Sequence, residues 1–164
     1  MDIIALRGKP NTGKTTTIKH LIKDILSPCG DRERGELLYC RYKRPMLDRV
    51  LDPNDEKWFT SKEKKNVQNV TVLVKYNEKY IAITTLGDGK DLIVGAYNSA
   101  KKNLESKYGI RQIDIYICAC HPRMDVEKMF GCKTKYVDKN DFPDAEKNDS
   151  YFKNLMLDKM EESL

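Results

Sequence analysis

The sequence has no long run of apolar residues. The apolar stretch near its start, Ile3 to Leu6, is four residues long and ends at Arg7. A helix that crosses a bilayer needs about 20 such residues, and a secretory signal peptide needs an apolar segment of at least about seven. We therefore expect a soluble, cytoplasmic protein without a leader peptide or a membrane partner.

Cysteines with the spacing of a disulfide framework or a zinc site are also lacking. Cys118 and Cys120 lie two residues apart in an apolar run and so share one face of a strand, and with His121 and Cys132 they could imitate a metal site. A tetrahedral zinc site usually has paired C-x-x-C spacing, so we interpret them as buried free thiols in a reducing compartment. The five cysteines, an odd number, are Cys29, Cys40, Cys118, Cys120 and Cys132.

The sequence contains no recognisable RRM, KH or helix-turn-helix signature. Its net charge of +5 comes entirely from residues 1–50, which hold 11 Lys/Arg and 6 Asp/Glu. A basic first third suits either a nucleic acid or a polyphosphate ligand, and charge alone does not choose between them. The missing signatures make nucleic acid the less supported partner.

Hydrophobic periodicity predicts alternating strands and helices. The expected strands are 2–7, 37–42, 70–76, 80–86, 113–120 and 135–137, and the expected helices are 14–26, 91–108, 124–130 and a C-terminal helix marked by Phe152, Leu155, Met156 and Met160. The strands at 70–76 and 80–86 flank a polar turn and form a hairpin, and Gly109 and Gly131 are suitable residues to follow helices.

This alternation predicts an α/β fold in three layers, a single domain spanning 1–164. We expect a mostly parallel sheet with helices on both faces, and one antiparallel edge strand contributed by the hairpin. The segment 43–67 contains Pro45, Pro53 and an isolated Trp58-Phe59 pair. It is interpreted either as a mobile loop near a ligand or as a short helical insertion with a local core.

The segment Gly8 to Thr15, GKPNTGKT, matches the pattern G-x-x-x-x-G-K-[ST] between a predicted strand and a predicted amphipathic helix. The glycines let successive backbone N–H groups converge on phosphate oxygens. The start of the helix adds unpaired N–H groups and the positive end of its dipole. Lys14 brings a full charge to the β- and γ-phosphates, and the Thr15 hydroxyl can ligate Mg²⁺.

This segment resembles the Walker A motif of the P-loop NTPase superfamily. The resemblance implies Mg-nucleotide binding by Gly13, Lys14 and Thr15, with Thr16 touching the α-phosphate. Pro10 has no N–H, so one phosphate contact of the family is missing, although Lys9 adds a nearby charge. The residues expected to bind the nucleotide are Gly8, Lys9, Asn11, Thr12, Gly13, Lys14, Thr15 and Thr16.

A Mg²⁺ site also needs a carboxylate at the carboxyl end of a neighbouring strand. Asp88 follows the apolar strand at 80–86, and the hairpin with its strand-end Gly-Asp resembles the second and third strands of small GTPases. We predict Thr15 and Asp88 as metal ligands and reject Asp114, which lies near the start of its strand. The strand end is not Asp-Glu, so the chain resembles the small kinase and GTPase branch more than motor-type ATPases.

Phosphoryl transfer needs cations on the moving phosphate. The candidates are Arg41, Lys43, Arg44 and Arg123, each of which is also compatible with a solvated surface charge. Arg123 completes a predicted catalytic set with Lys14 and Asp88. His121 could orient a ligand. The segment Asp138 to Asp141, DKND, imitates the guanine-binding motif poorly because an ionised aspartate replaces the donating asparagine, which favours ATP over GTP.

Three functions fit these residues. The first is a small phosphotransferase that moves the γ-phosphate of ATP to a small acceptor. The second is an NTPase that switches the conformation of 43–67 and of the turn Gly87–Lys90 for a protein partner. The third and least supported is an ATP-using nucleic-acid-binding accessory protein.

Overall fold

Strands and helices alternate along most of the chain. The computed structural model describes residues 1–10, 12–27, 33–42, 69–139 and 145–164, and for residues 42, 145 and 146 it describes the main chain only. The elements are β1 (Asp2–Arg7), α1 (Lys14–Leu26), β2 (Glu36–Tyr42), β3 (Val70–Tyr76), β4 (Lys79–Thr84), α2 (Lys90–Tyr108), β5 (Ile115–Cys120), α3 (Val126–Phe130), β6 (Thr134–Asp138) and α4 (Ala145–Glu162).

The described strands form one mixed sheet in the order β2-β3-β4-β5-β1-β6. The pairs β4–β5, β5–β1 and β1–β6 are parallel, whereas β3 is antiparallel to both of its neighbours. β1 therefore lies between two parallel partners, with Ala5 opposite Cys118 on one side and Tyr136 on the other. Any loop that leaves the carboxyl end of β1 starts from the interior of the sheet.

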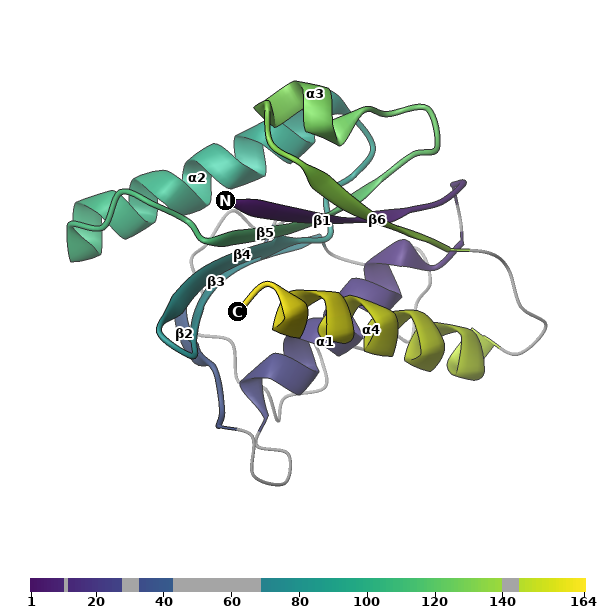
Figure 1. The fold of residues 1–164 in the computed structure, drawn as a ribbon, viewed down its shortest axis with the longest axis horizontal. Coiled ribbons are helices and arrows are strands. Elements are labelled where there is room, and N and C mark those ends of the chain that lie inside the picture. Colours follow the sequence, from purple (N-terminus) through teal and green to yellow (C-terminus); the bar gives the residue numbers. More distant parts are fainter. Residues whose placement is uncertain (11, 28–32, 43–68, 140–144) are drawn as a thin grey trace.

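Helices cover both faces of the sheet, with α1 and α4 on one face and α2 and α3 on the other (Figure 1). The side chains of β1 alternate accordingly: Ile4 and Leu6 belong to the core beneath α1 and α4, whereas Ile3 and Ala5 belong to the core beneath α2. This alternation is the period-2 pattern of a strand that is buried on both faces. The predicted α/β fold with helices on both faces is confirmed.

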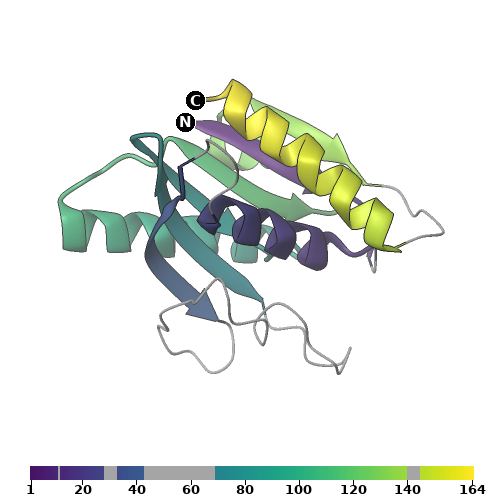
Figure 2. The same ribbon diagram turned by 90° about the horizontal axis from the view of Figure 1, so that it is seen from below.

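α1 and α4 lie side by side across one face (Figure 2). The apolar stripe of α1, which includes Ile18, Ile22 and Ile25, is fully buried, and α4 adds Met156 and Met160 to the same core. This face carries the first turn of α1, so the packing of α4 fixes where that turn sits on the sheet.

The hairpin is in the predicted place, but its position in the sheet corrects one expectation. Asn77 and Glu78 both have positive φ, 47° and 60°, as a two-residue type I′ turn requires. β3 is not the edge strand that we expected, because β2 pairs along its outer side. The sequence predicted β2 as a strand but contained no local signal for its partner.

The cysteines of β5 are buried, as predicted. Cys118 and Cys120 lie in the core beneath α2, and burial raises the pKa of the Cys120 thiol to about 11. They behave as small apolar side chains of a central strand. Each helix in the described part of the chain is too short or too polar to cross a lipid bilayer.

Candidate functional site

The loop between β1 and α1 starts at the carboxyl edge of the sheet. The Gly8 amide donates to the carbonyl oxygen of Cys120 at 3.1 Å, so the parallel pairing with β5 continues one residue beyond β1. A Cβ on Gly8 would lie 2.9 Å from Thr12 Oγ1 and 3.1 Å from the Lys139 carbonyl oxygen. Only glycine allows the loop to fold back this closely on itself and on the segment that follows β6.

Lys14 closes the loop from the other end. Its Nζ donates to the carbonyl oxygens of Gly8 at 2.7 Å and Lys9 at 2.8 Å, and Thr12 Oγ1 donates to the same Lys9 carbonyl at 2.9 Å. An ammonium group has three donors. Among the described residues Lys14 Nζ has these two acceptors, so one N–H remains for a further acceptor.

The charge of Lys14 is held in a partly desolvated place. Burial lowers the pKa of Lys14, while Asp88 raises it and Lys139 lowers it through their charges. Only 9% of the residue is exposed. A buried ammonium gains more from a nearby anion than an exposed one does, because water screens the attraction less.

The first turn of α1 is open to an anion. Gly13 precedes the helix with φ 77°, a left-handed conformation that favours glycine. In the described residues no side chain caps this terminus, and the first turn contains no acidic residue. The N–H groups at the start of a helix have no intrahelical partner, so those of Thr15 and Thr16 are suited to bind phosphate oxygens.

A pocket of about 250 Å³ lies beside the loop. It is lined by Arg7, Gly8, Lys9, Thr12, Pro122, Asp138 and Lys139. Two of these side chains are already paired: Arg7 Nε and Nη2 donate to the two carboxylate oxygens of Asp138 at 2.6 and 3.1 Å, and this pairing lowers the pKa of Asp138. The guanidinium also lies 4.1 Å from the centre of the Tyr136 ring.

A buried polar network lies against the loop from the side of α4. Lys139 Nζ donates to Asn148 Oδ1 and, at 3.0 Å, to Asp149 Oδ1, and Thr17 Oγ1 donates to the same Asp149 oxygen at 2.7 Å. A Cβ on Gly13 would lie 3.4 Å from Asp149 Oδ1 and 3.6 Å from Lys139 Nζ. The network therefore joins α1, α4 and the end of β6 directly beneath the loop.

Asp88 lies at the end of β4, on the same edge of the sheet. β5 separates β4 from β1, so the ends of β4 and β1 are about 10 Å apart at the usual strand spacing. Asp88 nevertheless interacts electrostatically with Lys14 and lies 3.5 Å from His121 Nε2, which follows β5. His121 is therefore a direct neighbour of the predicted metal carboxylate.

Thr15 and Asp88 are the residues near the loop that could hold Mg²⁺. In the part of the chain that the structure describes, no three His, Cys, Asp or Glu side chains cluster as a metal cage would require. Mg²⁺ usually takes one or two protein oxygens and completes its shell with phosphate oxygens and water. The hydroxyl of half-buried Thr15 and the exposed carboxylate of Asp88 match that modest requirement.

The remaining predicted residues are dispersed. Arg123 is exposed in the turn after β5, at the correct edge but with no ion-pair partner among the described residues. Arg41 lies on β2, four strands from β1. Asn11, Lys43 and Arg44 lie outside the described residues. Asp114 accepts a hydrogen bond from the Tyr80 amide at the amino end of β5, as its rejection anticipated.

Sequence reasoning missed the residues that support the loop from behind. Lys139 was considered only as part of a poor guanine motif, and Asp149 and Thr17 had no predicted role. Their signal is topological: β6 lies next to β1, so the residue after β6 must lie beside the loop after β1. No local pattern in the sequence states that adjacency.

No family model, curated protein or solved structure matches this chain.

The turn that carries Asp88 depends on Gly87, which gives a matched pair of variants. A Cβ on Gly87 would lie 2.6 Å from the Ala119 carbonyl oxygen, whereas one on Gly89 would meet nothing within 4 Å. We expect Gly87→Ala to lower the free energy of unfolding by about 1–3 kcal/mol through overpacking. Gly89→Ala meets no such clash and should lower it by less, about 0.5–1 kcal/mol, because alanine is a poorer N-cap for α2 than glycine. Urea denaturation measures both, and equal effects would contradict this packing.

Proposed function

We propose that this protein binds a nucleoside triphosphate with Mg²⁺ at the loop Gly8 to Thr15 and transfers its γ-phosphoryl group to a small acceptor. The observation that carries the proposal is the closed form of the loop. The Lys14 ammonium bridges the Gly8 and Lys9 carbonyls at one end of the loop, and a helix that no described side chain caps begins at the other end. The Walker A resemblance agrees with this arrangement.

The triphosphate would be held by three kinds of group. Backbone N–H groups at the start of α1 would donate to phosphate oxygens, assisted by the helix dipole. The remaining N–H of Lys14 would meet the β- and γ-phosphates. Thr15 and Asp88 would hold Mg²⁺, directly or through water, and the metal would neutralise the developing phosphate charge. Arg123 is the candidate for an additional cation on the moving phosphoryl group.

The paired state of Asp138 favours ATP over GTP. Guanine recognition needs a donor for the guanine carbonyl, and Asp138 stands where the guanine motif has a donating asparagine. Both of its oxygens accept from Arg7, which also lowers its pKa. The carboxylate is therefore an acceptor only, and it is already engaged.

The main alternative is an NTPase that acts as a switch for a partner. Both reactions use the same phosphate loop and the same metal. They differ in the group that attacks the γ-phosphorus: an oxygen of the acceptor in transfer, and water in hydrolysis. In either case the bond from that phosphorus to the bridging oxygen breaks, and the nucleoside diphosphate leaves.

Removing the Lys14 ammonium should weaken nucleotide binding. A charge-assisted hydrogen bond contributes about 1.5–3 kcal/mol, so Lys14→Ala should raise the Kd for Mg-ATP by about 10- to 150-fold. Isothermal calorimetry measures this. Lys102→Ala, on the exposed surface of α2, is the control and should bind as the unmodified protein does. Unchanged binding by Lys14→Ala would reject the nucleotide site.

Neutralising Asp88 should affect turnover more than binding. Asp88→Asn keeps the shape of the side chain but removes the metal-binding charge, so Mg-dependent ATP turnover should fall by at least about 100-fold. The Kd for the nucleotide should change by less than about threefold, because the loop supplies most phosphate contacts. Asp2→Asn, the same charge change at the opposite edge of the sheet, should leave both quantities unchanged. Equal turnover by Asp88→Asn would assign the metal to another residue.

The fate of the phosphoryl group separates transfer from hydrolysis. We expect label from γ-labelled ATP to appear in an organic acceptor when the protein is incubated with Mg²⁺ and a panel of small alcohols, carboxylates and phosphate esters. Chromatography of the products gives the result, with Lys14→Ala as the inactive control. Label found only in free phosphate would favour the switch.

A further inference from the structure

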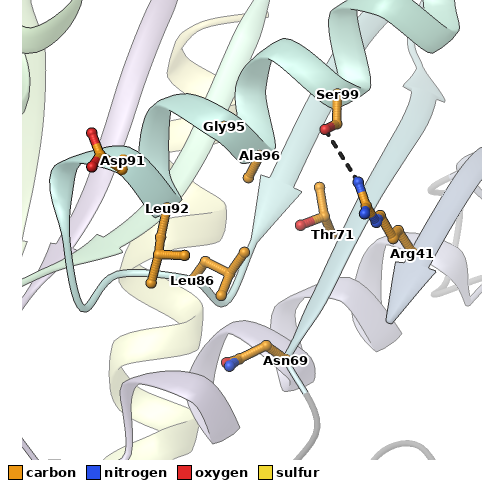
Figure 3. Close-up of a pocket in the computed structure, with 9 residues that line it drawn as sticks. All are labelled: Arg41, Asn69, Thr71, Leu86, Asp91, Leu92, Gly95, Ala96 and Ser99. Carbon is orange, nitrogen blue, oxygen red and sulfur yellow. Dashed lines mark hydrogen bonds between the residues drawn. The ribbon is translucent and has the colours of Figure 1, made fainter. Parts of the chain in front are cut away.

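A second pocket opens on the other face of the sheet, between the first three turns of α2 and the ends of β2, β3 and β4. Its volume is about 280 Å³, close to the lower limit for sites of small molecules. Figure 3 shows that residues of α2 face Arg41 of β2 and Thr71 of β3 across it, with Asn69 just before β3 and Leu86 just after β4. The pocket is lined by Arg41, Asn69, Thr71, Leu86, Asp91, Leu92, Gly95, Ala96 and Ser99.

One side of this pocket is apolar and the other side donates hydrogen bonds. Leu86, Leu92 and Ala96 form the apolar side, and Arg41 lies across from them (Figure 3). Arg41 Nη1 donates to Ser99 Oγ at 3.4 Å, a long bond that leaves most of its five donors uncommitted. No carboxylate of the described residues lies within ion-pair distance of this guanidinium.

The other polar groups also favour an anionic occupant. Asn69 Oδ1 accepts from Thr85 Oγ1 at 3.2 Å, so its amide N–H₂ remains to donate. The Thr71 and Thr84 hydroxyls bond each other at 2.9 Å, which fixes the floor of the pocket. Asp91 is exposed at the first turn of α2, and Figure 3 places its carboxylate at the end of the pocket away from Arg41.

Gly95 keeps part of the pocket open. It lies in the interior of α2, where glycine costs about 0.5–1 kcal/mol relative to alanine. A Cβ on it would meet no atom within 4 Å, so no packing in the described residues requires glycine there. Gly95 lines the pocket and is exposed, so we expect a larger side chain at this position to occupy the open side of the pocket.

We propose that this pocket binds a small organic anion, with its apolar body against Leu86, Leu92 and Ala96 and its carboxylate or phosphate on Arg41. Leu86 lies two residues from Asp88, a distance that the chain can extend to at most about 7 Å. The apolar body of the ligand, against Leu86, would therefore lie closer to Asp88 than its anionic group on Arg41 does. Its assignment as the phosphoryl acceptor rests on the proposed function, whereas its binding does not.

Phenyl phosphate is a probe of suitable size, because it combines an aromatic body with one anionic group. Titration of the full chain, followed by ¹⁵N NMR, should shift the amide signals of Leu86, Gly95 and Ser99. Benzyl alcohol lacks the charge and should bind at least about fivefold more weakly. Inorganic phosphate lacks the apolar body and should shift only the signals of the phosphate loop, such as Gly13 and Thr15.

Two variants test the pocket directly. Gly95→Leu fills it and raises helix propensity, so it should abolish the shifts while the fold is retained. Asn98→Leu, at an exposed position of α2 outside the pocket lining, is the matched control and should bind normally. Arg41→Gln should weaken phenyl phosphate at least about fivefold and leave benzyl alcohol unchanged.

The outcomes separate this site from the phosphate loop. Lys14→Ala should keep phenyl phosphate binding in the pocket even though it loses Mg-ATP binding. Gly95→Leu should lose phenyl phosphate binding in the pocket and keep Mg-ATP binding. Any of three results would overturn the proposal: amide shifts confined to the loop, equal affinity for the charged and neutral probes, or no shift up to about 10 mM probe. That concentration is well above the usual range of substrate affinities.

Discussion

The bridge from the Lys14 ammonium to the carbonyl oxygens of Gly8 and Lys9 is the interaction on which the candidate site depends. Without it, a cation at the start of α1 and a turn at the end of β1 would be separate features. With it, the loop becomes a closed ring whose two carbonyl dipoles point at the ammonium. That arrangement keeps the carbonyls turned toward Lys14 and leaves the amides of the helix start for an anion.

The ring is fixed in place by the network beneath it. Lys139 and Thr17 both donate to Asp149. The accepting oxygen is so near the loop that a Cβ on Gly13 would lie 3.4 Å from it. Without Asp149, burying the Lys139 ammonium near the Lys14 ammonium would be costly, because like charges repel strongly in a poorly screened site. The carboxylate offsets the charge of Lys139. Under the proposed function, Lys14 and the exposed Lys9 would be the cations that a phosphate meets, and the side chains that stabilise the loop would also set its affinity for phosphate.

Local features of the fold were predictable, and long-range ones were not. The strand 2–7 and the helix 14–26 were predicted with their observed bounds. The hydrophobic pattern changes from a continuous apolar strand to helical spacing across the glycine-containing loop, and this change marks where the strand ends and the helix begins. The hairpin was predicted from its β-branched arms and the polar turn between them, and Asn77 readily adopts the positive φ of that turn, whereas Glu78 rarely does. Three other features are consequences of strand order: β2 pairs outside β3, β5 lies between β4 and β1, and Lys139 supports the loop. Strand order is set by the packing of distant segments, which no local period encodes.

Strand order also changes what the basic residues can do. Arg41 was expected to clamp phosphates, but three strands lie between β2 and β1, which makes four strand-to-strand spacings. At the usual strand spacing this is about 19 Å, which is too far for a direct contact with a phosphate on the loop. Arg41 instead lines a pocket with one apolar side. Leu86 lines the same pocket, and Asp88, two residues further along the chain, interacts electrostatically with Lys14. A switch needs one nucleotide site and a movable segment. A phosphotransferase needs two ligand sites that share an edge, and the pocket that we propose for an organic anion would supply the second of them.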